Sequence, residues 1–527
     1  MVGSVEFPQI AGPAYTYPSW PIDCQESINF EPLPVESKDS PYKSMLVGTP
    51  GLEHLRFRFG NEILDDIPAG GDYPIRGLHR CMRGFGGDPD PATVVVAGKF
   101  VYQVKAPNAD GVCELVRLME LPSPDSEWTS RVSMADGGGE PYSNGNLGPK
   151  LVIADGKFFH VIDMENGTSE QVYDPPCSPD FVTFLDGRVY ACGKDVAHGL
   201  KEGRVYWSAI NDPSSWGGAD FVSAAASNDP LQCVKAVSNY LWLIGTDTFE
   251  VWQTSATSGG VMYSPIRRVM GSADGVGTAS GRSVATISNR IYFVGGGTTG
   301  HGRIYEGEGT RLHYISTDAM EQEFRKYNME NSFGFCYSDE GRAYYCVTFI
   351  DDDVTWVYCH DSKSWHKRSS RTATNDLKRW CVGHATYNFG MVIAGSLSSS
   401  RLYRMASDIY TEDGSTILRK RVSPHIVTGP NFTRHSSFTL DIETGTALEY
   451  GQGSEPQVML QALDDGGRIK RGERWISTGR NGNYRKRVKW YRLGQARDRA
   501  YEITVSDPVR WVIYGARVEI ENQTGGL

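Results

Sequence analysis

The sequence predicts an all-β protein with a β-propeller, a second β-domain of sandwich or barrel type, and an extended N-terminal arm. A repeated hairpin pattern, scarce helical periodicity and two changes of composition along the chain support this prediction. The repeat starts at the turn Asp186-Gly187 and returns at Ser238-Asn239, Ser288-Asn289 and Glu340-Gly341, in steps of 52, 50 and 52 residues. Such residue pairs tolerate the positive φ of tight hairpins. A period near ~50 residues with several strands per unit is typical of propeller blades.

The first element is an extended arm over residues 1–47. Prolines and aromatic residues alternate irregularly through it, at Pro8, Pro13, Pro18, Pro21, Pro32, Pro34 and Pro41 and at Tyr15, Tyr17, Trp20 and Phe30. Proline disfavours regular structure and stiffens the chain toward extended conformations, while the aromatic rings need a surface to bury them. We therefore expect the arm to lie along its own chain or a neighbouring subunit, and it could add a strand to either domain.

The second element is a propeller over residues 48–414. Hairpin-forming runs occur at residues 93–104, 150–162, 181–192, 234–245, 284–294, 333–348 and 382–394. The spacing is less regular before Asp186, so the pattern favours six blades and leaves seven open. One helix is predicted to start at Thr317 or Asp318, because Glu321 stands three residues after Asp318 as in a capping box.

The third element is a platform domain, a β-sandwich or barrel, over residues 415–527. It contains 18 Lys and Arg against 12 Asp and Glu, a net charge of +6, which leaves −16 for residues 1–414 because the whole chain carries −10. An acidic domain repels a phosphate backbone, whereas a basic one attracts acidic partners or nucleic acid. For any single Lys or Arg, solvation of an exposed strand face is the simpler interpretation.

Patterns for catalysis and metal binding are weak. The ten cysteines include no CxxC pair and lie mostly in strand runs, which indicates reduced cysteines in the core. One grouping lacks the paired spacing of structural zinc sites, namely Cys346, Cys359, His360 and His366. The run 295–300 matches GxGxxG but is followed by a strand rather than a helix, and the acidic run 351–353 is interpreted as a turn. We predict no cofactor, no metal and no catalytic residue.

The sequence also shows no pattern typical of a membrane span or an export signal. No apolar run approaches the ~18 residues of a membrane span. The first residues do not show a basic region followed by an apolar segment. We expect a protein that is made in the cytosol and has no membrane span.

The last hundred residues carry the most specific pattern. It consists of Asp465-Gly-Gly467, Trp475, Gly479, Gly482-Asn-Tyr484, Arg487-Val-Lys-Trp490, Arg492-Leu-Gly494, Arg497 and Ser506-Asp-Pro-Val509. Further short matches follow in order along the chain, among them Thr49-Pro-Gly-Leu52 and Asn211-Asp-Pro-Ser-Ser-Trp216. With these residues, nearly the whole chain resembles the packaged-DNA stabilisation proteins of short-tailed bacteriophages. It differs by a longer arm and by insertions near residues 106–148 and 195–203.

The resemblance implies a structural virion protein of the phage tail, made in the host cytoplasm and without enzymatic activity. In this family a ring of identical subunits, a hexamer, forms a hub or nozzle below the portal or head-to-tail adaptor. The ring retains packaged DNA and continues the ejection channel without sequence-specific binding. It also anchors a tail needle or plug and the fibres or spikes.

Five basic residues of the platform are candidate contacts with a neighbouring subunit or the portal: Arg485, Lys486, Arg487, Lys489 and Arg492. Alternation along a strand would place Arg485, Arg487 and Lys489 on one face. The alternative is a solvated strand face whose long side chains cover apolar surface.

Two other function classes stay open. Asp464-Asp465-Gly466-Gly467 followed by Trp475 resembles the Asp box of sialidase-type propellers, which suggests a glycan-binding or glycan-degrading tail enzyme. Such an enzyme needs two carboxylates beside an open cleft. A host-type propeller scaffold would instead bind peptide partners.

Overall fold

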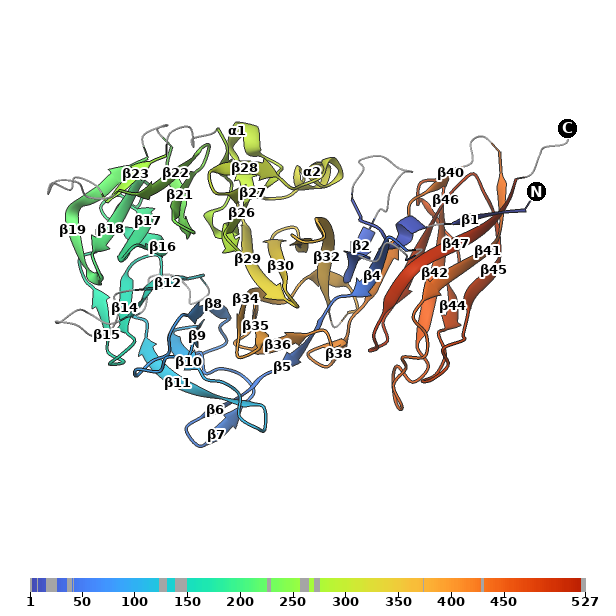
Figure 1. Ribbon diagram of the computed structural model, residues 1–527, viewed down its shortest axis with the longest axis horizontal. Helices are drawn as coiled ribbons and strands as arrows, with labels where there is room; N and C mark the ends of the chain where they lie inside the picture. Colours follow the sequence, from blue (N-terminus) through green and yellow to red (C-terminus); the bar gives the residue numbers. More distant parts are fainter. Residues whose placement is uncertain are drawn as a thin grey trace.

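The computed structural model describes residues 2–6, 8–15, 26–35, 40, 42–122, 130–137, 149–224, 229–255, 265–269, 275–372, 374–427 and 431–522. Within these ranges, seven β-sheets surround one axis as a propeller, and a β-sandwich lies beside it (Figure 1). The all-β prediction of a propeller with a second β-domain is therefore confirmed. The limits of the arm, propeller and platform at residues 47/48 and 414/415 stay predictions.

The first four blades follow one another along the chain. Blade 1 is β8 (Ile75–Cys81), β9 (Ala92–Ala97), β10 (Phe100–Val104) and β11 (Val112–Glu120), extended by β6 (Arg56–Phe59) and β7 (Glu62–Leu64). Blade 2 is β12 (Ser133–Gly137), β13 (Lys150–Ala154), β14 (Phe159–Asp163) and β15 (Ser169–Val172). Blade 3 is β16 (Ser178–Leu185), β17 (Arg188–Lys194), β18 (Arg204–Ala209) and β19 (Asp212–Ser223). Blade 4 is β20 (Leu231–Val237), β21 (Tyr240–Gly245), β22 (Phe249–Thr254) and β23 (Ile266–Arg268).

The remaining three blades complete the ring. Blade 5 is β24 (Gly277–Thr278), η2 (Gly281–Ser283), β25 (Ala285–Ile287), β26 (Arg290–Gly296), β27 (Ile304–Glu308) and β28 (Arg311–Tyr314). Blade 6 is β29 (Ser332–Asp339), β30 (Arg342–Phe349), β31 (Val354–Cys359), β32 (Ser364–Arg371) and β33 (Leu377–Arg379). Blade 7 is β34 (Val382–Asn388), β35 (Met391–Ser396), β36 (Leu402–Ala406) and β5 (Gly51–His54), followed by the hairpin β37 (Thr411–Glu412) and β38 (Ser415–Thr416).

The favoured count of six blades was wrong, because the described residues form seven. Each of the seven hairpins found in the sequence lies in a different blade. Blade 7 takes its fourth strand, β5, from the N-terminal side of the propeller, where it pairs antiparallel with β36. The blade therefore never appears as one complete unit in the sequence. In blade 1, β6 joins β11 in parallel, which further disturbs the spacing at the start of the repeat.

The turns that defined the repeat have the predicted backbone conformation. The φ angles are 46° at Asp186, 53° at Ser238, 48° at Ser288 and 48° at Glu340. The predicted helix also forms, as α2 (Asp318–Phe324) with Thr317 as its N-cap, accepting from the backbone N of Met320.

The expected capping box was wrong, because Glu321 contacts Arg303 (Nε to Oε1 3.1 Å) and accepts from the Ser316 hydroxyl. A second helix, α1 (Gly297–Gly300), is a single turn before β27. No helix in the described ranges is long and apolar enough to cross a membrane.

The sandwich consists of two packed sheets. One contains β1 (Val2–Glu6), β3 (Phe30–Pro34), β4 (Ser44–Gly48), β41 (Thr433–Ile442), β45 (Val488–Ala496) and β47 (Val512–Asn522). The other contains β39 (Arg419–Val422), β40 (Ile426–Val427), β42 (Gln457–Asp464), β43 (Ile469–Lys470), β44 (Arg474–Ser477) and β46 (Asp498–Val505). Alternate side chains from both sheets fill the core, including the buried Phe438, Leu460, Trp490, Tyr501 and Val518.

A short strand joins the two domains into one continuous sheet. β2 (Glu26–Ile28) pairs in parallel with β32 of blade 6 and antiparallel with β39 of the sandwich. The next residue, Asn29, donates from Nδ2 to the carbonyls of Ser369 in blade 6 (2.9 Å) and Leu418 beside β39 (2.8 Å). Its Oδ1 accepts from the Ser369 backbone N at 3.0 Å. Because the ladder of β2 and the side-chain amide of Asn29 bond to both domains, the relative placement of the domains is restrained.

The described parts of the arm pack on their own chain. The 3-10 helix η1 (Pro8–Ala11) buries Ile10 in the sandwich core. Tyr15 lies in the propeller core, with its ring centroid 4.8 Å from that of Trp356. The fully buried Arg421 donates to the carbonyls of Ile10 (2.9 Å) and Gly12. The arm therefore lies between the two domains and contributes to both cores.

A cavity of about 230 Å³ lies at the centre of the propeller. All seven blades contribute to its lining, through β8, β12, β16, β20, β25, β29 and β34 and the adjoining η2. We call it the axial cavity. Its described lining contains no Asp or Glu.

Candidate assembly surface

The five basic candidates lie in three different environments at the outer side of the sandwich, where β45 is the edge strand of its sheet (Figure 1). Strand β45 begins only at Val488, so Arg485 and Arg487 precede it. The predicted alternation of Arg485, Arg487 and Lys489 along one strand face was therefore wrong. Gly482 and Asn483 indicate a turn, but they do not show at which later residue the strand begins. The sequence pattern therefore placed the start of this strand too early.

Arg485, Lys486 and Arg487 are exposed on the loop before β45. We call residues 485–487 the basic loop. The adjoining segment is held in place, since Gly482 N donates to the Gly445 carbonyl (3.1 Å) and Thr444 Oγ1 donates to the Tyr484 carbonyl (3.2 Å). No carboxylate of the described residues lies within 4.0 Å of the three cationic groups. The basic loop therefore presents, from a positioned backbone, three charges that are unpaired within the ranges that the structure describes.

Lys489 lies on the outer face of the sheet and already has a partner. Its Nζ is 2.9 Å from Glu519 Oε1 on β47 and 5.1 Å from the centroid of the exposed Tyr491 ring. The Ser437 hydroxyl donates to the same carboxylate at 2.6 Å. Lys489 is thus partly neutralised within its own sheet.

Arg492 has a positive φ of 56° and borders a groove between the two sheets. The groove has a volume of about 380 Å³, and its basic lining residues are Arg471, Arg474, Arg492 and Arg499. Arg474 donates to the carbonyls of Tyr491 (2.6 Å) and Arg492 (3.1 Å), which holds β44 against β45. Sequence reasoning missed Arg471 and Arg474 because only the folding of β44 beside β45 brings them to Arg492.

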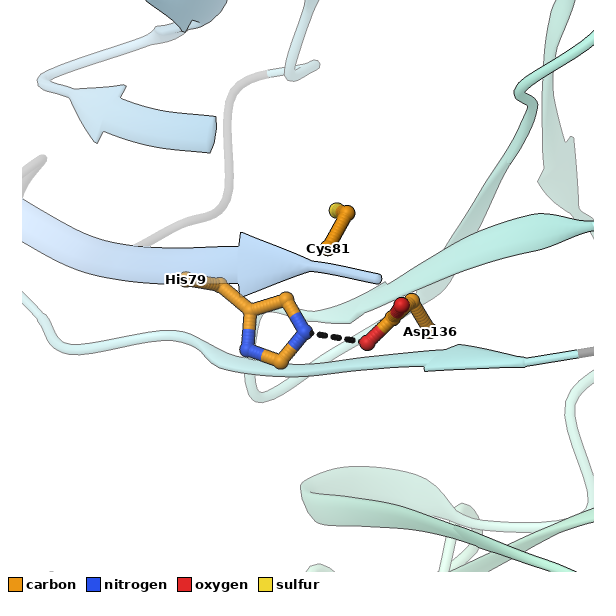
Figure 2. Close-up of side chains that lie close together, drawn as sticks. All are labelled: His79, Cys81 and Asp136. Carbon is orange, nitrogen blue, oxygen red and sulfur yellow. Dashed lines mark hydrogen bonds and ion pairs between the residues drawn. The ribbon is translucent and has the colours of Figure 1, made fainter. Parts of the chain in front are cut away.

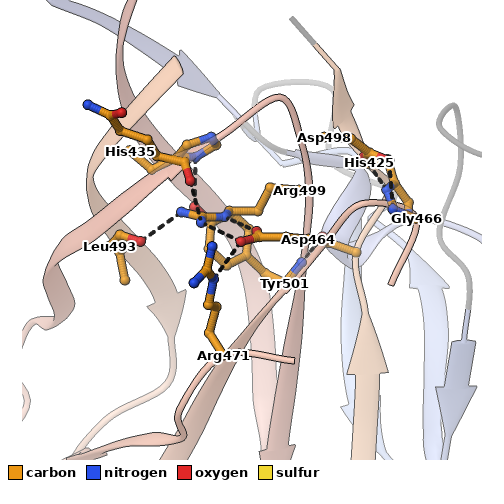
Figure 3. Close-up of polar contacts among 11 residues, drawn as sticks. His425, His435, Asp464, Gly466, Arg471, Leu493, Asp498, Arg499 and Tyr501 are labelled. Carbon is orange, nitrogen blue, oxygen red and sulfur yellow. Dashed lines mark hydrogen bonds and ion pairs between the residues drawn. The ribbon is translucent and has the colours of Figure 1, made fainter. Parts of the chain in front are cut away.

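An ion-pair network forms the floor of this groove (Figure 3). The fully buried Arg499 contacts Asp464 twice, at 2.6 Å and 3.0 Å, and Arg471 Nε is 2.6 Å from the same carboxylate. Burial raises the pKa of Asp464, but the two arginines outweigh burial and hold it below its usual value. The acidic residue of the Asp-box-like pattern therefore has a structural role here.

A second cluster lies between blades 1 and 2 (Figure 2). The ligand atoms of His79, Cys81 and Asp136 lie within 4.8 Å of one another, which is compatible with a metal ion. However, Asp136 already accepts from His79 Nε2 (2.7 Å) and from the Met82 backbone N (2.8 Å). Burial raises the pKa of the Cys81 thiol, which disfavours the thiolate that a metal needs. The cluster thus joins two blades, and we assign no metal to it.

Comparisons with known proteins match both domains. A family model described as the β-propeller of bacteriophage P22 Gp10 matches residues 146–410, and a model of its β-sandwich matches residues 419–521. No curated protein matches the chain.

Among solved structures, a chain of the Mitotic Checkpoint Complex has 13% identity and a TM-score of 0.37, over 64% of this chain and 92% of that chain. The extracellular domain of a putative hybrid two-component system from B. thetaiotaomicron has 9% identity and a TM-score of 0.38. The match covers 76% of this chain and 45% of that chain. TM-scores this low carry no argument about function.

The two family models together cover more than half of the chain, and the propeller and sandwich that they describe occur in the same order in the fold. The chain therefore belongs to the bacteriophage P22 Gp10 family of DNA-stabilisation proteins, which are structural components of the virion tail.

Proposed function

We propose that this protein assembles as a hexameric ring, a hub or nozzle below the portal or head-to-tail adaptor. The ring would retain packaged DNA, continue the ejection channel without sequence-specific binding, and anchor the needle or plug and the fibres or spikes. This role needs large interfaces that close into a ring rather than catalytic groups. The lack of carboxylates in the described lining of the axial cavity disfavours a two-carboxylate glycosidase at that position.

The basic loop is the observation that carries the proposal. Its three cations have no ion-pair partner in the described part of the chain and belong to a platform with a net charge of +6, whereas residues 1–414 carry −16. Strand β2 and Asn29 restrain the platform against the propeller. We assign the basic loop of one subunit to the acidic propeller surface of the next. Such a head-to-tail contact is heterologous, the type of contact that forms a ring when the rotation between subunits closes, and opposite charges favour its register.

Reversing the charge of the basic loop tests this assignment. Arg485→Glu, Lys486→Glu and Arg487→Glu are combined in one full-length protein. We expect the combined variant to remain a folded monomer when mixed with portal, whereas the unaltered protein forms rings. Ring formation is measured by native mass spectrometry and negative-stain microscopy.

The matched control reverses three cations of blade 1, Arg56→Glu, Arg58→Glu and Lys105→Glu, which changes the net charge equally. We expect this control to form rings. Normal ring assembly by the basic-loop variant would refute the assigned contact, and rings that form but do not bind portal would move the contact from the neighbouring subunit to the portal.

A further inference from the structure

The axial cavity concentrates positive charge. Arg131, Lys235 and Arg282 line it from blade 2, blade 4 and η2 of blade 5. None of the three forms an ion pair within 4.0 Å with any residue in the described ranges. The cavity therefore gathers three cations with no carboxylate at ion-pair distance in the described ranges, and the more distant Asp180 offsets the charge of Arg282 only in part.

Neutral groups hold the two guanidinium groups in place. Arg131 Nη2 donates to the Gly383 carbonyl at 2.9 Å, and its guanidinium carbon lies 3.6 Å from the centroid of the Phe333 ring. The guanidinium carbon of Arg282 lies 4.9 Å from the centroid of the Phe181 ring. Ring faces attract cations, but they do not cancel a full charge.

The charge of Arg282 acts on Arg131, and both arginines act on His384. Burial, together with the nearby charge of Arg282, lowers the pKa of Arg131 to about 9. Burial also lowers the pKa of His384, with additional contributions from Arg131 and Arg282. The buried Nε2 of His384 has no hydrogen-bond partner among the described residues. Partly buried charges of one sign are costly unless a counter-charge is present.

We infer that the axial cavity binds an oxyanion of the phosphate class, held by Arg131 and Arg282 with Lys235 as a third cation. The planar guanidinium group presents paired N–H donors that match phosphate oxygens. A volume of about 230 Å³ admits a phosphate with several water molecules, but not a nucleic-acid duplex. The site therefore differs from any surface along which packaged DNA passes.

Calorimetric titration of the full-length protein in phosphate-free buffer tests the inference. Inorganic phosphate and a nucleoside monophosphate are titrated separately at constant ionic strength, because the same group could enter free or as part of a larger molecule. We expect binding of phosphate and a higher melting temperature in its presence. Arg282→Met and Arg131→Gln should each weaken phosphate binding about tenfold or more.

Arg58→Gln, on the exposed side of blade 1, removes one positive charge elsewhere and should leave phosphate binding unchanged. In phosphate-free buffer, Arg282→Met should be at least as stable as the unaltered protein, because it removes a desolvated charge that Asp180 offsets only in part. If Arg282→Met is stable in phosphate-free buffer, its weaker phosphate binding reflects loss of the site and not misfolding. Tighter binding of the nucleoside monophosphate would identify a larger ligand. Absence of phosphate binding, or unchanged binding by both cavity variants, would overturn the inference.

Discussion

At the scale of single residues, Glu31 of β3 is buried at the junction of the two domains. The Tyr344 hydroxyl of blade 6 approaches both carboxylate oxygens, at 3.1 Å and 3.2 Å. Burial raises the pKa of Glu31 to about 7, despite the lowering effect of the Tyr344 hydrogen bond. A carboxyl group between the domains is therefore protonated in the folded protein at a pH where most carboxyls are ionised.

This shift predicts a specific pH dependence. The folded protein keeps a proton on Glu31 that the unfolded chain releases between pH 4.5 and about 7, so this residue lowers the free energy of unfolding as pH rises through that interval. Glu31→Gln should remove this part of the slope and should be relatively more stable above pH 7. Urea unfolding of both proteins across the interval measures the difference.

The exposed carboxyl Glu53, changed to Gln, provides the control and should leave the slope nearly unchanged. Identical pH slopes for the unaltered protein and Glu31→Gln would contradict the assignment of a raised pKa.

At the scale of elements, closure of the propeller depends on β5. Leu52 is fully buried in the core of blades 6 and 7. Its strand, β5, pairs with β36, and nearly the whole propeller sequence lies between these two strands. The ring therefore has no free strand edge at the point where its first and last segments meet.

Truncating Leu52 should weaken this closure strongly. We expect Leu52→Ala to lower the free energy of unfolding by about 2–5 kcal/mol through lost burial and a residual cavity. The neighbouring Glu53 is exposed and forms a surface ion pair with Arg404. Glu53→Ala should therefore lower the free energy of unfolding by less than about 1 kcal/mol. Urea unfolding measures both, and equal losses would show that β5 is not a closing strand.

The elements also show which features a sequence can predict. The turns at Ser238 and Glu340 depend on local backbone preferences, so the turns could be placed correctly and the strand ends of their hairpins to within three residues. The pairing of β5 with β36 depends on contacts across hundreds of residues, which no local pattern encodes, and the blade count was wrong for this reason.

The same limit applies to the assembly surface. The local pattern identified Arg492 as basic and exposed, but the approach of Arg474 and the partner of Lys489 depend on which strands lie side by side. Charge could be predicted, whereas the environment of each charge could not.

At the scale of the whole molecule, the two domains share their cores. Residues of the arm are buried in both, Ile10 in the sandwich and Tyr15 in the propeller, while β2 completes a sheet common to the two. Unfolding of either domain would expose surface of the other.

We therefore expect one cooperative thermal transition for the full chain in calorimetry. Leu52→Ala in the propeller should lower the melting temperature of the sandwich as well, reported by hydrogen–deuterium exchange of the peptides that contain Trp490 and Trp511 of the sandwich core. Two separated transitions, with only the propeller affected by Leu52→Ala, would show that the domains unfold independently.

The position of β1 and β5 has a consequence during synthesis. A ribosome makes β1 and β5 before their partners, β47 and β36, which emerge hundreds of residues later. A nascent or prematurely ended polypeptide consequently has an open propeller and an unfinished sandwich. Closure of the propeller and completion of the sandwich therefore both wait for segments that are made late, β36 and β47.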